Sequence, residues 1–283
     1  MYPTVKVITP PRSQNLISLA QVKLYFGDTT TDNDPLYTSL IRDASAAMIT
    51  FIGVHPGRQQ YQELSHGNGG YRRLLSRLPV EPGTLSVTLN GEVLTESDPS
   101  TETNPPDPLN FILEDPQIGQ VYRLARWWWP ALPTYNLIDT YYAGFLFPDQ
   151  ITDWTPGGTF TAGAWVRSPT QPLLLRFECT IPGVSGSTEP VWPSVIGQEV
   201  VDNTVTWTAR AATELPPFVS QWCWAEVLRL NSDLDWKPNL ITRTVEGVSE
   251  SRFARKQDDG ALAAATTAGL ISWRNELGLV GVA

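Results

Sequence analysis

The spacing of apolar residues changes twice along this chain, and that change limits the fold more than any other feature. Between Leu36 and Ile52 apolar side chains recur at helical spacing, and over residues 61–142 short runs alternate in the way half-buried strands do. Helical spacing returns after Pro216 and Pro217. The order predicts an α+β protein: a small helical core of N- and C-terminal helices, a β-hairpin and sheet region, and an inserted all-β module.

Start and stop signals place the first two helices. Ser18 and Gln21 have the spacing of a capping box, which predicts a short helix that stops at Gly27. Asp34-Pro35 predicts a second start, with Asp as the N-cap and Pro in the first helical position. Gly53 then ends a helix of about eighteen residues.

Turn signals divide the region that follows into strands. Asn90-Gly91 is the strongest two-residue hairpin signal, and it joins two alternating runs. Residues 61–64 read as a strand, residues 65–70 as a Gly-rich turn, and residues 71–75 as the returning strand. Further strands are expected at residues 111–113, 120–122 and 136–142.

Residues 148–214 differ in composition, because they are rich in Gly, Pro, Thr and Trp and have no helical periodicity. They predict an inserted β-sandwich-like module, with residues 1–147 and 215–283 forming the rest of the fold. A helix is expected after Pro216 and Pro217, with Phe218, Trp222, Ala225 and Leu228 (or Arg229) on one face. A last helix is expected from about residue 259 to residue 277.

Composition argues for a protein with many contacts. Charged residues make up 17% of the chain, below the roughly 25% of an average soluble protein, and there are 11 Trp. Interfaces are poor in Lys, Glu and Asp and rich in aromatic residues, although a Trp-rich core would look the same. The net charge of −9 disfavours binding of free DNA, which normally needs a basic face.

Residue types for catalysis or metal binding are scarce. The two histidines and two cysteines do not have the spacing of a zinc site. His66, between Ser65 and Gly67, is expected to be a turn residue rather than part of a Ser-His-Asp system. Cys179 and Cys223 are expected to be buried apolar residues of a protein built for a reducing compartment. We therefore expect no enzyme activity, metal or cofactor. We also expect no signal peptide and no membrane span.

Three consecutive tryptophans precede a proline at residue 130. Consecutive residues of a strand point to opposite faces, so Trp128 would face one side and Trp127 and Trp129 the other. If one side is core, the other exposes a large aromatic ring. Trp127, Trp128 and Trp129 are therefore candidates either for the core or for contact between subunits.

Several segments in order resemble the head-tail connector (adaptor) proteins of tailed bacteriophages. The resemblance begins at residues 16–23 (LISLAQVK) and continues at residues 34–41 (DPLYTSLI). Residues 142–145 (YAGF) resemble the end of a family strand, and residues 215–219 (LPPFV) resemble the start of the helix that follows it. Residues 249–253 and the final helix complete the likeness, which covers about three quarters of the chain.

The resemblance implies a structural virion protein in the neck between capsid and tail, assembled in the host cytoplasm. Its expected partners are the portal protein, a stopper or tail-completion protein, and further copies of itself in a ring, twelvefold in the family. DNA would pass through the ring as cargo without sequence-specific binding. A tail or decoration protein with a glycan-binding module is the alternative, and a hydrolase would need a nucleophile or carboxylate pair that the sequence does not offer.

The inserted module is similar to a Trp-rich β module of phage structural and tail proteins that is sometimes described as carbohydrate-binding. This likeness makes Trp165, Trp192 and Trp207 candidates for contact with a glycan or a partner.

The C-terminal segment is the candidate for docking on the portal. Its helix pairs a sparse apolar stripe with a side of small residues, and the tail after Gly278 is uncharged and apolar. Burial of such a tail in a partner would remove apolar surface from water, although folding back on its own subunit would do so too. The docking candidates are Leu270, Trp273, Leu277, Leu279, Val280 and Val282.

Overall fold

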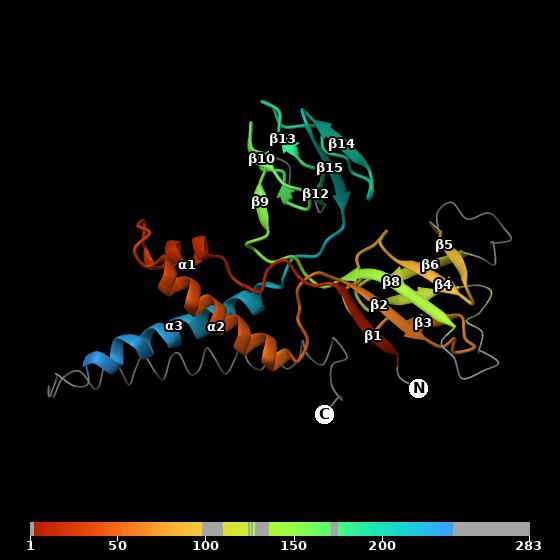
Figure 1. Cartoon of the computed structure of the whole chain (residues 1–283), viewed down its shortest axis with the longest axis horizontal. Coiled ribbons are helices and arrows are strands. Elements are labelled where there is room, and N and C mark those ends of the chain that lie inside the picture. The colour runs from red at the N-terminus through yellow and green to blue at the C-terminus, as the bar shows by residue number, and fades with distance from the viewer. Residues whose placement is uncertain are drawn as a thin grey trace. The chain divides into compact units, whose positions relative to one another are not determined.

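The computed structural model describes residues 3–97, 110–123, 125, 127, 136–170 and 175–239. It is a β-rich α+β fold. The chain divides into two compact units (Figure 1). The β unit comprises the described residues up to Arg12 together with Gly57–Leu146 and Gln150–Thr213. The helical unit comprises Ser13–Pro56, Phe147–Asp149 and the described residues from Glu214 onward.

Local signals set the starts of the helices in the helical unit, which are α1 (Leu19–Phe26), α2 (Asp34–Ile52) and α3 (Pro217–Asn239). The capping box is confirmed, since the Ser18 hydroxyl accepts from Gln21 N and the Gln21 side chain accepts from Ser18 N. The helix N-cap before α2 is Asn33, one residue earlier than expected. Asp34 instead binds the ammonium group of Lys23 at 2.6 Å.

The helical unit has a continuous apolar interior. α2 packs against both α1 and α3, and it buries Leu40, Ile41, Ala44 and Met48 at helical spacing. In the described part of α3, Val219, Cys223 and Val227 are fully buried and lie four positions apart, whereas Phe218 and Trp222 of the expected face are partly buried. Large aromatic residues on several sides of this helix obscured the narrower stripe.

One curled sheet forms the larger part of the β unit. Its strands are β1 (Thr4–Thr9), β2 (Gln59–Ser65), β3 (Arg72–Leu74), β4 (Ser86–Leu89), β5 (Glu92–Glu96), β6 (Asn110–Asp115), β7 (Gln120–Tyr122) and β8 (Leu137–Ala143). Their order is β1-β2-β8-β4-β5-β6-β7-β3, and every neighbouring pair is antiparallel except β5 and β6. β1 had not been expected from the sequence.

The expected pairing of residues 61–64 with residues 71–75 was wrong. β2 pairs with β1 and β8, whereas β3 pairs with β7, so the Gly-rich turn connects strands that are not neighbours. The Asn90-Gly91 hairpin is confirmed. Both residues have positive φ, 53° and 88°, and β4 pairs with β5 around them.

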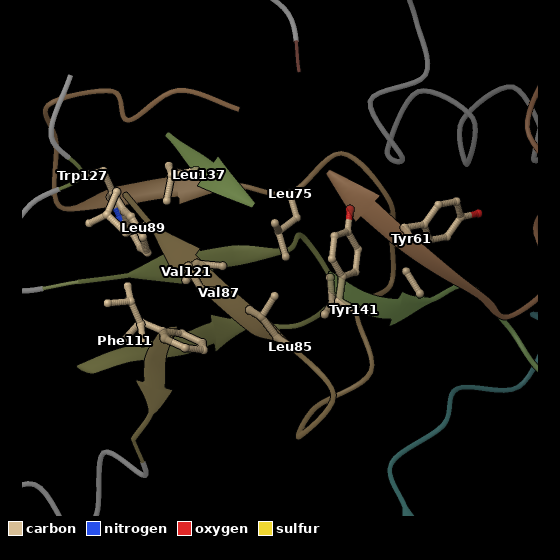
Figure 2. Close-up of a cluster of buried hydrophobic side chains, with 13 residues drawn as sticks. Tyr61, Leu75, Leu85, Val87, Leu89, Phe111, Val121, Trp127, Leu137 and Tyr141 are labelled. Carbon is tan, nitrogen blue, oxygen red and sulfur yellow. The ribbon is translucent and has the colours of Figure 1, made fainter. Parts of the chain in front are cut away.

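The eight-stranded sheet holds an extensive cluster of buried apolar side chains. Alternating burial along β2 and β8 places every second residue inside, as period-two side-chain geometry requires. Figure 2 shows Leu89 from β4, Phe111 from β6 and Val121 from β7 within this cluster. The expectation of a small helical core was wrong, because the described fold is mostly strands, with three helices beside them.

Residues 151–210 form sheets of their own, within the range expected for the inserted module. The strands are β9 (Ile151–Asp153), β10 (Thr159–Phe160), β11 (Trp165–Arg167), β12 (Arg176–Ile181), β13 (Gly183–Val184), β14 (Glu199–Asp202) and β15 (Val205–Arg210). Five of them form a sheet in the order β14-β15-β12-β11-β9, and β10 pairs with β13. They enclose a separate cluster that includes Phe177, Trp192 and Trp207.

Candidate interaction surface

Within the described part of the chain, no group of three or more His, Cys, Asp or Glu residues could hold a metal ion. In that same part, no helix is both long and apolar enough to cross a bilayer. His55 lies against the ring of Phe147, at 5.7 Å between centroids, and burial lowers the pKa of its imidazole. Both cysteines are buried, as expected, and burial raises the pKa of the Cys223 thiol to about 12.

Buried ionisable side chains lie inside the curled sheet. Arg73 forms a bidentate ion pair with Asp139, and both side chains are buried. Burial raises the pKa of Asp139 even with this guanidinium beside it. Glu63 accepts hydrogen bonds from Ser76 N, Ser76 Oγ and Tyr141 Oη, each at 2.9 Å. Both carboxylates are thus held by the protein's own groups, which indicates a structural role.

Trp127 belongs to the core of the sheet. Its ring is fully buried, its indole N–H donates to Tyr71 O at 3.1 Å, and the guanidinium of Arg73 lies 4.3 Å from the ring centroid. The sequence left two interpretations open for Trp127, the core and a contact between subunits. The structure supports the core, so Trp127 is no longer a candidate for subunit contact. Trp128 and Trp129 lie outside the described residues.

Trp165, Trp192 and Trp207, the candidates for contact with a glycan or partner, are all buried in the described structure. A sugar platform needs an open ring face, but Trp192 stacks on Phe177 at 4.1 Å and packs edge-on against Trp207. The indole N–H of Trp192 donates to Glu189 at 2.6 Å, and that of Trp207 donates to Asp202 at 3.2 Å. The rings of Trp192 and Trp207 belong to the module's interior, whereas the ring of Trp165 lies against the guanidinium of Arg58, at 4.9 Å from the ring centroid.

An exposed apolar surface occurs at the end of α1. Leu24 is 84% exposed and Tyr25 is 62% exposed. The Tyr25 ring lies 5.0 Å from that of Trp224 on α3, which is itself only partly buried. We call Leu24, Tyr25 and Trp224 the α1 surface. Aromatic residues and a leucine on a rigid, capped helix are the side chains that commonly anchor protein contacts.

The residues behind the α1 surface hold it in place. Phe26 stacks on Tyr37 of α2, at 5.3 Å between parallel rings, and meets Tyr25 edge-on at 5.5 Å. Gly27 ends the helix in a left-handed conformation, and its N–H bonds back to Leu24 O. Sequence reasoning missed this surface, although Leu24-Tyr25-Phe26 was a visible signal. Three consecutive apolar residues on a helix cannot all face one core.

The six portal-docking candidates, Leu270, Trp273, Leu277, Leu279, Val280 and Val282, lie outside the described residues. No family model, curated protein or solved structure matches the chain.

Proposed function

We propose that this chain is a non-enzymatic assembly subunit, and specifically a head-tail connector of a tailed bacteriophage. The observation that carries the proposal is the α1 surface, because Leu24 and Tyr25 directly follow the segment, residues 16–23, that resembles the opening helix of connector proteins. A helix that exposes Leu24 and Tyr25 beside a tryptophan is suited to packing against another chain.

In this proposal copies of the chain pack side by side in a ring. Burial of a large apolar side chain contributes about 1.5–3 kcal/mol, so contacts at Leu24 and Tyr25 would strengthen association substantially. The ring would sit on the portal, lead to a stopper or tail-completion protein and pass DNA through its centre. A net charge of −9 fits that role, because a channel of like charge does not retain the DNA. The apolar C-terminal tail is the proposed portal-docking segment.

The contribution of the α1 surface is tested by placing a charge on it. Leu24→Glu and Tyr25→Glu, each made in the full chain, should weaken self-association at least tenfold, as measured by sedimentation velocity across a concentration series. Both side chains are exposed, so the substitutions should leave the far-UV circular dichroism unchanged.

Val191→Glu is the matched control. Val191 is as exposed as Leu24, at 88%, but it lies in the β module. The control should associate like the unmodified chain. If the Leu24 and Tyr25 variants associate as strongly as the control, the α1 surface is not a subunit contact.

A further inference from the structure

Within the described residues, the eight-stranded sheet has a short junction between two sets of strands. β2 and β8 pair over seven residues, whereas β5 and β6 pair, among the residues that the structure describes, at Thr95–Asn110 and Glu96–Phe111. Beyond this short junction lie β6, β7 and β3, which pair with one another over three residues each. We call these three strands the flap, and β1-β2-β8-β4-β5 the main sheet.

Side chains hold the free end of the flap to the main sheet. From β3, Arg73 reaches across the inside of the curl to Asp139 on β8, with Nη1 at 2.6 Å from Oδ2. Just after β3, the backbone and hydroxyl groups of Ser76 bind Glu63 on β2. We call these four residues the latch. Arg77 N also donates to the Tyr141 hydroxyl at 3.2 Å.

One backbone hydrogen bond supplements the latch. Val80 N donates to Pro116 O, in the turn between β6 and β7, at 2.8 Å. Val80 itself bridges to Ala143 at the end of β8. The end of the flap is therefore joined to the main sheet at a few points rather than by a ladder of backbone pairs.

The positions of the two acidic residues explain why the latch is polar. Glu63 and Asp139 lie directly opposite each other in the β2–β8 register, and both are buried. Like charges in that arrangement destabilise a sheet, and buried charges need partners. The partners come from residues 73 and 76, and Tyr141 adds a hydrogen bond to Glu63. With the flap closed both carboxylates are satisfied, and with it open water can solvate them.

We propose that the flap is a conformational device, which opens as one unit at the latch while the main sheet stays folded. Opening separates Phe111 and Val121 from Val87 and Leu89, with which they form one apolar cluster. It thereby gives the fold a second state with an uncovered apolar face, which a binding partner can stabilise. This inference is independent of the proposed function.

Native-state hydrogen exchange of the unmodified chain in low concentrations of urea tests the proposal. The backbone amides of the flap, such as those of Leu113 and Val121, should exchange through a local opening. The equilibrium constant of this opening should be at least tenfold larger than that of the opening that exposes the main-sheet amides of Tyr61 and Tyr141. The flap opening should also depend less on urea, because less surface is exposed. If the flap and main-sheet amides exchange with the same opening constant and the same urea dependence, the proposal is overturned.

A matched pair of arginine variants tests the latch itself. Arg73→Met removes the buried ion pair with Asp139. Arg72 is the preceding residue of β3, and Arg72→Met removes an exposed ion pair with Glu114 of β6 and a contact with the Tyr122 ring. Arg73→Met should speed exchange in the flap at least tenfold beyond Arg72→Met and leave the main sheet unchanged. Equal effects of the two variants, or equal acceleration in flap and main sheet, would contradict it. If Arg73→Met does not fold, the measurement on the unmodified chain decides.

Discussion

At the scale of single residues, buried carboxylates organise the β module. Asp202 accepts three hydrogen bonds, from the indole N–H groups of Trp154 and Trp207 at 2.8 and 3.2 Å and from Gly186 N at 2.7 Å. Tryptophan has one donor, and in a buried site that donor needs an acceptor. Asp202 thus allows two large rings to enter the interior without leaving a polar atom unsatisfied.

Asp202→Ala should therefore destabilise the module strongly. It leaves three donors without an acceptor, and each buried unsatisfied donor costs about 1–3 kcal/mol, so a loss of roughly 3 kcal/mol or more is expected. Amide hydrogen exchange of β12 and β15 measures it. Asp153→Ala in the same module is the control, since it removes only an exposed ion pair with Arg167 and should cost less than about 1 kcal/mol. Equal losses would show that the indole hydrogen bonds contribute little.

Asp28, in the connection between α1 and α2, should titrate at an unusually low pH. The side chain of Asn33 and the backbone N–H and hydroxyl of Thr30 donate to its carboxylate, and they lower its pKa from 3.8 to about 2. A lowered folded-state pKa means that the ionised form favours folding. This contribution is present above pH 4 and is lost as the pH falls toward 2.

Carbon-13 NMR of the Asp28 carboxyl group checks this prediction. Asn33→Ala removes the largest cause and should move the midpoint up toward 3.8. Midpoints near 3.8 in both proteins would contradict the hydrogen-bonding arrangement of this turn.

At the scale of elements, features encoded within a few residues could be predicted and long-range pairing could not. The capping box at Ser18 and the Asn90-Gly91 hairpin depend on local backbone geometry, so their spacing was sufficient. The partners of β2 and β3 depend on strands far along the chain, which no turn signal reports. The same limit applies to the candidate tryptophans. Alternation along a strand shows which residues share a face, but it does not show whether the rest of the chain covers that face.

The β module should be separable from the rest of the chain. Its strands pair among themselves in the described structure, and they enclose their own apolar cluster. Replacement of residues 148–214 by a short Gly/Ser linker should leave a chain that folds and associates, because the module interrupts an otherwise short join. Size-exclusion chromatography with circular dichroism checks this. A shortened chain that neither folds nor associates would show that the module is integral.

At the scale of the whole molecule, low charge content and eleven tryptophans had two explanations. Trp127, Trp154, Trp165, Trp192 and Trp207 are core residues, so part of the aromatic content is explained without partners. The exposed Leu24 and Tyr25 next to Trp224 still argue for a contact with another chain. The sequence could predict that apolar surface needed covering, but only the structure separates the rings that cover one another from those left at the surface.

Electron microscopy of the negatively stained, full-length chain, alone and mixed with portal rings, tests the connector assignment most directly. The account predicts closed rings with a central hole, which stack coaxially on the portal. A chain that stays monomeric at every concentration, both alone and with the portal, would contradict it.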